Sequence, residues 1–520
     1  MTRKPNFLFF ITDQHRADWL SCTGHSVVRT PNIDKIAAEG TLFKDFHVAL
    51  PVCMPNRASL MTGRMPSVHG LRHNGCILQK RANTFVDLLA AGGYATASIG
   101  KSHLQPFTDL PPIRATDNLE RLIPEAWKSD AADYNMEEPS SFNSDSVSAF
   151  EVPYYGFQHV DMVTNHGDKC GGQYGQWFRK TVPNWQALHD PANELDHNYT
   201  CPQAYRTPIP EESYPTKWIA DRAIDYLESR MDENGPFFAF VSFPDPHHPF
   251  NPPGKYWDMY RPDEFSVNLP YGAHENPIPP MEHANQIWEA GEMPPISQSA
   301  FMADDQQIRE AMALTAGMIT MIDDQIGRVV KSLKDSGHYE NTVIIFTSDH
   351  GDYLGDFNML LKGPLQLPSI TRVPMIWSDP KSRAAVLTEA MASTIDLSAS
   401  ILDRAGLEPF NGIQGRSFLN ALDGKSSHRD EVFIEHNDGG PRMGLKQAAR
   451  VRTIRNKKWR FSVFAGENWG ELYDLEHDPK ETKNLWHNPI YSHQKAYLSL
   501  QLIEYLTFQM DESPRAMRLA

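Results

Sequence analysis

The stretch Pro5-Asn-Phe7-Leu-Phe-Phe-Ile11-Thr-Asp13 is the segment from which the fold can be predicted. Its apolar part, Phe7–Ile11, is short, shows no alternation with polar residues and stops before Asp13. This pattern is typical of a strand buried on both faces of a parallel sheet. Helical patterns lie between this run and similar apolar runs at 94–99, 237–243 and 342–347. Strands that alternate with helices predict a doubly wound α/β domain with a mostly parallel sheet.

The chain has 520 residues, more than one simple core accommodates, so we expect two units. The alternating pattern assigns 1–380 to the α/β domain. Within it, 105–215 is rich in Pro, Asn, Asp and aromatic residues, and we interpret it as an insertion with little regular structure. A strand pair in 451–464 and a terminal helix around 494–510 predict that 381–520 forms a smaller α+β lobe.

The composition excludes several classes of protein. The 49 Lys and Arg residues against 65 Asp and Glu give a formal net charge of −16, which argues against general nucleic-acid binding. The apolar run near the N-terminus is too short for an export signal, and no later stretch is long enough to span a bilayer. We therefore expect a cytoplasmic protein that does not bind membranes. The five cysteines are widely spaced without a CxxC pair, which disfavours a disulfide framework or a structural zinc site.

Polar and charged residues follow each predicted strand of the sheet. In open α/β sheets ligands bind beyond the carboxyl ends of the strands, so these residues predict one shared site. They are Asp13 and Gln14, Lys101 and His103, Asp245, His247 and His248, and Asp349, His350 and Asp352. Two carboxylates with one imidazole, from Asp13, Asp349 and His350, suit one divalent cation such as Ca²⁺ or Mn²⁺. A role for His350 as a hydrogen-bond partner of Asp349 stays open.

The segment Cys53-Met-Pro-Asn-Arg57-Ala-Ser-Leu-Met-Thr-Gly63 predicts a helix that starts close to Cys53. Backbone N–H groups at a helix start favour anions, and Arg57 adds a positive charge one turn later. Such a place can lower the pKa of a thiol, so a plain cysteine nucleophile is one interpretation. A buried structural cysteine is the other.

The same segment resembles the signature of the sulfatase family, Cys-x-Pro-x-Arg followed by Ala-Ser-Leu-Met-Thr-Gly-Arg. Further segments resemble that family in the same order along the chain, among them 100–104, 246–250, 348–352, 372–374 and 471–475. The resemblance implies an alkaline-phosphatase-like fold and the hydrolysis of a small-molecule sulfate ester. It also implies that a formylglycine-generating enzyme oxidises Cys53 to formylglycine, the nucleophile, which joins Asp13, Asp349 and His350 around the metal.

Asp13-Gln14 together with Asp349-His350 resembles the branch that contains choline sulfatases and phosphonate monoester hydrolases. In the mechanism that the resemblance implies, Arg57, Lys101 and Lys362 surround the tetrahedral anion. His247 is then the general acid that protonates the leaving oxygen, and His103 is the base of the second step.

Several alternatives remain open at this point. Asn74 is either a hydrogen-bond donor to the substrate or a turn residue before Gly75. The main alternative function is hydrolysis of a phosphonate monoester or phosphodiester on the same scaffold. A non-enzymatic binding protein is disfavoured because every charged position of the site is filled. The identity of the alcohol and the formation of a homo-oligomer are left open.

Overall fold

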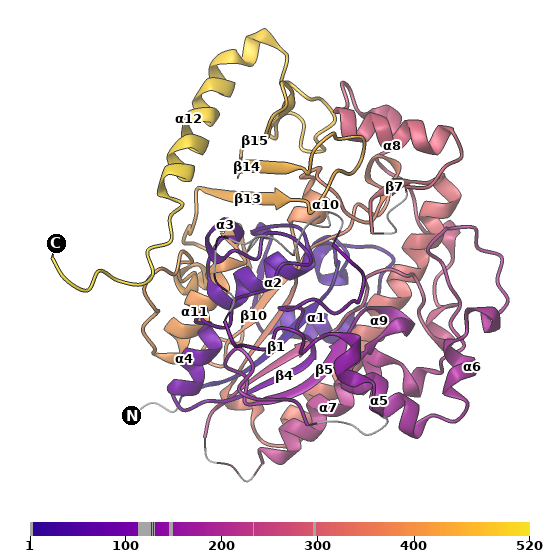
Figure 1. The fold of residues 1–520 in the computed structure, drawn as a ribbon, viewed down its shortest axis with the longest axis vertical. Helices are drawn as coiled ribbons and strands as arrows, with labels where there is room; N and C mark the ends of the chain where they lie inside the picture. Colours follow the sequence, from indigo (N-terminus) through magenta and orange to yellow (C-terminus); the bar gives the residue numbers. More distant parts are fainter. Residues whose placement is uncertain are drawn as a thin grey trace.

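The structure is a computed structural model, and it describes residues 4–112, 126, 128, 130–144, 149–231, 233, 235–294 and 298–519. Its centre is an eight-stranded sheet (Figure 1). In spatial order the strands are β11 (Val386–Thr388), β2 (Thr41–Phe43), β10 (Met375–Ser378), β8 (Thr342–Ser348), β1 (Asn6–Thr12), β6 (Phe237–Ser242), β4 (Ala95–Lys101) and β5 (His159–Thr164). Strand β10 runs antiparallel to both of its neighbours, and the other pairings are parallel.

Strand β1 lies at the middle of the sheet and is buried along its whole length. Phe7, Phe9 and Ile11 belong to the hydrophobic core on one face of the sheet, whereas Leu8 and Phe10 belong to the core on the other face. A strand with apolar contacts on both faces shows no polar alternation, which explains the uninterrupted run in the sequence. The prediction of a doubly wound, mostly parallel sheet is confirmed.

Helices cover both faces of the sheet. The core that contains Phe7 is completed by α2 (Cys53–Thr62), α4 (Phe85–Ala91) and α11 (Ile395–Ala405). The core that contains Leu8 is completed by α1 (Pro31–Ala38), α7 (Pro215–Ser229) and the long α9 (Asp305–Asp335). The remaining helices are α3 (Pro66–His69), α5 (Gly172–Thr181), α6 (Trp185–His189), α8 (Pro279–Glu289), α10 (Pro368–Thr371) and α12 (Ser492–Phe508).

A smaller lobe follows near the C-terminus. Its antiparallel sheet consists of β13 (Glu431–Asn437), β14 (Arg450–Asn456), β15 (Trp459–Phe464) and β16 (Gly470–Asp474), and α12 packs beside it (Figure 1). Arg460 is fully buried in this lobe, where its guanidinium contacts the carboxylates of Glu471 and Glu481 at 2.8 and 2.6 Å. A buried charge is tolerated only when it is paired, so these contacts fix the two neighbouring strands and the 478–485 segment to each other.

The expectation of little regular structure in 105–215 was wrong for its second half. Strand β5 extends the large sheet at its edge, and α5 packs directly against it. The sequence pattern of β5 is weak because an edge strand is partly solvated: His159 is exposed and Asp161 is half-buried. Residues 113–125, 127, 129 and 145–148 of this segment lie outside the described part of the chain.

The boundary at residue 380 stays a prediction. Strand β11 and helix α11 lie beyond it in the sequence, yet β11 pairs with β2 and α11 packs against α2. Short strand pairs join loops around the sheet: β3 (Phe46–His47) with β12 (Ala392–Ser393), and β7 (Phe301–Met302) with β9 (Met359–Leu360).

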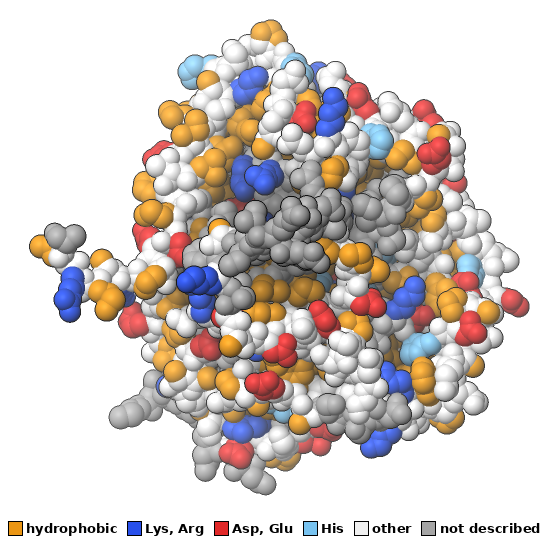
Figure 2. Space-filling view, in the orientation of Figure 1, with side chains coloured by type: hydrophobic (Ala, Val, Ile, Leu, Met, Phe, Trp, Pro, Cys, Tyr) orange, Lys and Arg blue, Asp and Glu red, His pale blue; other side chains and the backbone are white. Residues whose placement is uncertain are grey.

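The surface mixes both signs of charge. On the face drawn in Figure 2, Lys and Arg side chains are scattered among acidic and neutral ones. Helix α12 exposes apolar side chains, including Tyr497, Leu500 and Ile503. Among the described residues, no helix combines the length and the apolar character that crossing a bilayer requires.

Candidate active site

The carboxyl ends of five adjacent strands meet at one edge of the sheet. Strands β8, β1, β6, β4 and β5 are neighbours in that order, so the segments that follow them are brought together. The helix α2 adds its N-terminus to the same place, because its first residue, Cys53, lies beside the residues that follow β1 and β8. The residues that the sequence selected from separate strand ends therefore lie in one buried cluster.

Cys53 is the first residue of α2 and is 1% exposed. Its Sγ lies 3.1 Å from Nε2 of His350 and 3.6 Å from Oδ1 of Asp13. The side chain thus points into the cluster and away from the apolar core. The thiol stands where the oxygen atoms of an oxidised side chain would lie if this residue were converted to formylglycine.

The arrangement fits a divalent cation. One ligand atom each from Asp13, Cys53, Asp349 and His350 can be chosen so that all lie within 4.8 Å of one another. Nδ1 of His350 is 2.8 Å from the carbonyl oxygen of Gly351, a contact that assigns the proton to Nδ1 and leaves the Nε2 lone pair facing the carboxylates. Burial lowers the pKa of His350 to about 4, so its ring is neutral near pH 7 and able to ligate.

Arg57 and Lys101 balance the negative charges of Asp349 and Asp13. Nε of Arg57 donates to Oδ2 of Asp349 at 2.7 Å, and Nζ of Lys101 forms an ion pair with Asp13. Burial alone would raise the pKa of Asp13, but the positive charges of Lys101 and Arg57 hold it well below its usual value. Asp13 is therefore anionic at any physiological pH. Nη2 of Arg57 lies 3.5 Å from Asp13 without a hydrogen-bond partner among the described residues, so this donor remains free for a ligand.

His247 and Lys362 form a contact across the site. Nζ of Lys362 lies 2.7 Å from Nε2 of His247 and donates to Oε1 of Gln14, also at 2.7 Å. Nδ1 of His247 is 2.6 Å from the carbonyl oxygen of His248, so the geometry assigns its proton to Nδ1. Burial lowers the pKa of His247 well below its usual value, and the charge of Lys362 lowers it further. Any proton that is donated to a substrate here therefore comes from the hydrogen-bonded pair of Lys362 and His247.

His248 and Gln14 lie behind this pair. The ring of His248 stacks on His247 with centroids 4.0 Å apart, and Nε2 of Gln14 lies 3.2 Å from Nδ1 of His248. The backbone N–H of Gln14 donates to Oδ1 of Asp349 at 3.2 Å. Gln14 therefore connects the carboxylate of Asp349 to Lys362 and the two imidazoles.

His166 is a member of the cluster that sequence reasoning missed. Its Nε2 lies 2.6 Å from Nζ of Lys101, and its ring stacks on His247 with centroids 3.6 Å apart and an interplanar angle of 12°. Its ligand atom, with those of Asp13, Cys53 and His247, also falls within a 4.8 Å group. The available signal was the apolar stretch that ends at Thr164, followed by Asn165 and His166 as on the other strands.

His103 and Asn74 lie at the margin of the cluster. The ring of His103 stacks on Phe107 with centroids 3.8 Å apart, and its Nδ1 is buried without a partner among the described residues. Burial and the charge of Lys101 lower the pKa of His103 well below its usual value, so the ring is neutral and can accept a proton. Oδ1 of Asn74 accepts a hydrogen bond from the backbone N–H of Met54 at 3.2 Å, which supports the first turn of α2.

Comparison with known proteins agrees with this picture. The family model described as Sulfatase matches residues 5–145 and 147–407, and a model described as the C-terminal part of N-sulphoglucosamine sulphohydrolase matches 362–507. An arylsulfatase of Clostridium perfringens is 28% identical over 510 residues, which cover 97% of this chain and 94% of the relative. A multifunctional alkaline phosphatase superfamily protein of Trinickia caryophylli is 29% identical over 519 residues, which cover 95% and 93%.

Among solved structures, the phosphonate monoester hydrolase of Agrobacterium radiobacter superposes with a TM-score of 0.77 at 25% identity, covering 99% of this chain and 98% of that one. The expected alkaline-phosphatase-like fold is thereby confirmed. With one family model matched over most of its length and relatives aligned almost end to end, this chain belongs to the sulfatase family of sulfuric ester hydrolases.

Proposed function

We propose that this protein hydrolyses a sulfate ester, with a formylglycine made from Cys53 as the nucleophile and a divalent cation held by Asp13, residue 53, Asp349 and His350. The observation that carries the proposal is the position of Cys53 Sγ, within 3.6 Å of both Asp13 and His350 at the start of α2. An oxidised side chain at this position would offer oxygen to the ion and to the substrate from the same carbon atom.

The divalent cation and the formylglycine would have separate tasks. A bound divalent cation, Ca²⁺ or Mn²⁺, supplies positive charge that stabilises the sulfuryl oxygens and favours an ionised nucleophile. Hydrated formylglycine at residue 53 would supply a nucleophilic hydroxyl and a second hydroxyl that can lose a proton.

The side chains around the sulfuryl group stabilise charge and move protons. The free Nη2 of Arg57, Nζ of Lys101 and Nζ of Lys362 provide donors for the sulfuryl oxygens. When the bond between sulfur and the ester oxygen breaks, the Lys362–His247 pair delivers the proton that the leaving oxygen needs. His103, which is neutral, accepts the proton that must be removed before sulfate departs.

Hydrolysis of a phosphonate monoester or phosphodiester is the second candidate. It is favoured by the similarity to the phosphonate monoester hydrolase of Agrobacterium radiobacter over nearly the whole chain. The segment Gly100-Lys101-Ser102-His103 supports the sulfate ester, because Lys101 supplies a compact cation for the sulfuryl oxygens and His103 supplies the base that the second step needs. Maturation by a formylglycine-generating enzyme, a small-molecule substrate and a cytoplasmic location remain parts of the same proposal.

Cys53 is expected to carry an aldehyde or its hydrate when the chain is produced together with a formylglycine-generating enzyme. Mass spectrometry of the peptide that contains residue 53 measures this directly. The Cys76→Ser variant is the matched control, since Cys76 is a partly buried cysteine that lies outside the signature, and it should be modified at residue 53 as in the unaltered chain. An unmodified thiol at residue 53 in fully active protein would contradict the proposal and favour a thiolate nucleophile.

Removal of the metal is expected to abolish turnover. Exhaustive chelation should lower kcat by on the order of a hundredfold or more, because the positive charge at the sulfuryl oxygens is lost. Asp349→Asn should also lower the amount of metal that copurifies, measured by elemental analysis. Asp352→Asn should retain the ion, since Asp352 accepts backbone N–H groups of Leu354 and Leu361 instead. Full activity without metal would refute this part of the proposal.

Sulfate esters are expected to be hydrolysed faster than phosphonate monoesters. The measurement is kcat/KM for a nitrophenyl sulfate against a matched nitrophenyl phenylphosphonate. Lys101→Ala should lower kcat/KM for the sulfate, because the loss of one oxyanion donor costs about 2–4 kcal/mol of transition-state stabilisation. A phosphonate ester that reacts more than tenfold faster than the sulfate would transfer the assignment to the second candidate.

A further inference from the structure

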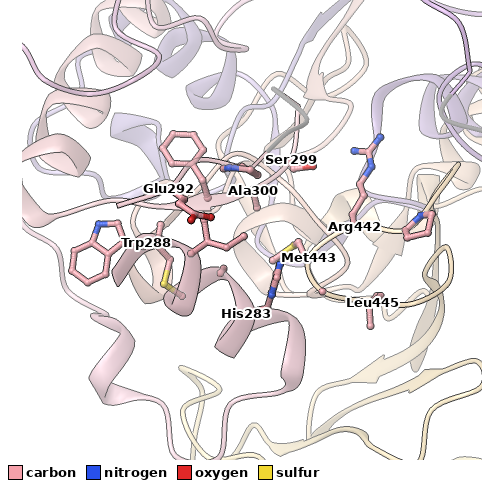
Figure 3. Close-up of a pocket in the computed structure, with 15 residues that line it drawn as sticks. His283, Trp288, Glu292, Ser299, Ala300, Arg442, Met443 and Leu445 are labelled. Atoms are coloured by element: carbon pink, nitrogen blue, oxygen red, sulfur yellow. The ribbon is translucent and has the colours of Figure 1, made fainter. Parts of the chain in front are cut away.

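A cavity of about 190 Å³ lies between helix α8 and the loop that joins β13 to β14 (Figure 3). Figure 3 shows Trp288 and Glu292 on one side of it and Arg442 and Leu445 on the other. Most of its wall is apolar and includes Ile287, Trp288, Phe301, Met302 and Leu445. A concave, mostly apolar cavity with a few polar groups is the usual form of a site for a small ligand.

The cavity and the active site share a wall. Met443, which lines the cavity, lies so close to Gly363 that a Cβ on that glycine would be 2.9 Å from its Sδ. Gly363 directly follows Lys362, whose Nζ contacts His247. On the other side, Gln298 lies close to His248, and Ser299 and Ala300 continue from it into the cavity wall.

The loop at this wall is held in a fixed shape. Met443 has φ +48° and Gly444 has φ +75°, so two consecutive residues adopt the left-handed region, which is costly for methionine. A Cβ on Gly444 would lie 2.7 Å from Cγ of His283, so the loop packs tightly against α8. The surrounding contacts therefore keep Met443 in place, and the cavity is preformed.

We propose that this cavity binds the apolar part of the alcohol half of the substrate. The inference deepens the proposed function and rests on it, because it takes the sulfuryl group to lie beside Lys362. Apolar walls select an apolar group, and an apolar cavity of roughly 150 Å³ is known to hold a benzene ring. The available volume thus accommodates one ring or a short alkyl chain.

Binding of linear alkyl sulfonates of increasing length tests the proposal. A sulfonate lacks the ester oxygen, so calorimetry reports binding in the metal-loaded protein without turnover. The Kd should fall by roughly fourfold for each methylene that enters the cavity and then level off. Trp288→Ala, which removes a wall, and Ala300→Leu, which fills the cavity, should both flatten this dependence while the shortest sulfonate binds as before. Met231→Ala alters an exposed apolar residue outside the cavity and should leave the dependence on chain length unchanged.

Two outcomes would overturn the assignment of the cavity: a Kd that does not depend on chain length, or a dependence that survives in both cavity variants. Turnover of sulfate esters is measured on the same preparations. Length-dependent binding without any hydrolysis of a sulfate ester would remove the proposed function and keep the cavity as a binding site. Hydrolysis of sulfate esters together with a Kd that does not depend on the chain length of the sulfonate would keep the proposed function and remove the cavity as a binding site.

A second inference comes from an independent observation, the position of Glu137. This carboxylate is fully buried and comes from the 130–144 segment. Its Oε2 accepts the backbone N–H of His103 at 2.8 Å, and its Oε1 accepts those of Leu104 and Gln105 at 2.9 and 3.1 Å. The hydroxyl of Tyr154 donates to the same oxygen at 2.5 Å. Both oxygens of Glu137 are therefore used to fix the loop that carries His103.

The loop needs this fixation because of the conformation of His103. Its φ is +59°, in the left-handed region that a residue with a Cβ adopts only at a cost. No side-chain hydrogen bond to Nδ1 orients its ring among the described residues. The contacts to Glu137 and the stacking on Phe107 are thus what holds the imidazole in place.

We infer that Glu137 is a positioning residue for the step in which His103 accepts a proton. Glu137→Gln keeps the shape and one carbonyl oxygen. If that oxygen serves Leu104, Gln105 and Tyr154, the new NH₂ group faces the N–H of His103, and a donor meets a donor. The variant therefore disturbs the anchoring of His103 and leaves Arg57, Lys101 and Lys362 in place around the sulfuryl group.

Rapid mixing with nitrophenyl sulfate separates the two halves of the reaction. In Glu137→Gln the first equivalent of nitrophenol should appear within about twofold of the normal rate, followed by a steady state that is at least tenfold slower. Tyr154→Phe should show the same pattern to a smaller degree. Glu138→Gln is the matched control, since it changes the neighbouring half-buried glutamate, and it should behave as the unaltered enzyme.

Two results for a folded Glu137→Gln variant would overturn the inference about Glu137. One is an equal decrease in the rate of the first nitrophenol release and in the steady-state rate, and the other is a normal steady-state rate. The melting temperature of each variant shows whether a loss of activity comes from unfolding alone. If Glu137→Gln does not fold, the two rates of Tyr154→Phe test the inference instead. A lack of nitrophenol release in the unaltered, matured enzyme would instead count against the proposed function.

Discussion

The buried carboxylate of Asp13 is the constraint on which the rest of the site depends. An uncompensated carboxylate in this position would cost several kcal/mol, so the fold has to bring positive charge to the end of β1. Lys101 arrives from β4, two strands away, and Arg57 arrives from α2. Because Arg57 also binds Asp349, the pairing fixes α2 against the sheet and thereby sets the position of Cys53.

The cluster holds charges of both signs. Arg57, Lys101 and Lys362 bring positive charge, while Asp13, Asp349 and the neighbouring Asp352, which accepts a hydrogen bond from Gln14, bring negative charge. Burial lowers the pKa values of His103, His247 and His350, so these rings add no charge near neutral pH. A sulfate ester and a phosphonate monoester both carry one negative charge. Discrimination between them therefore has to come from the placement of donors and proton acceptors, not from net charge.

The sequence allowed prediction of the sheet and of most of the cluster, for a physical reason. Strands such as β1 and β8 are buried on both faces, so they appear as apolar runs, and the polar residues after them are easy to identify. Strand β5 is an edge strand with exposed His159, and His166 was missed with it. The partners of Glu137, and the contact of Asn74 with Met54, depend on chain packing that no local pattern encodes.

Two parts of the chain outside the large sheet also contact the cluster. The 130–144 segment does so through Glu137, which fixes the loop of His103, and the C-terminal lobe does so through Met443, which packs on Gly363 beside Lys362. Neither contact adds a charge next to the sulfuryl group. In the proposed function, the strand ends determine which bond is broken, whereas these peripheral contacts orient a base and select the alcohol. Such a division would let one fold serve different substrates, because the charged residues belong to the strand ends of the scaffold and the selective contacts belong to loops.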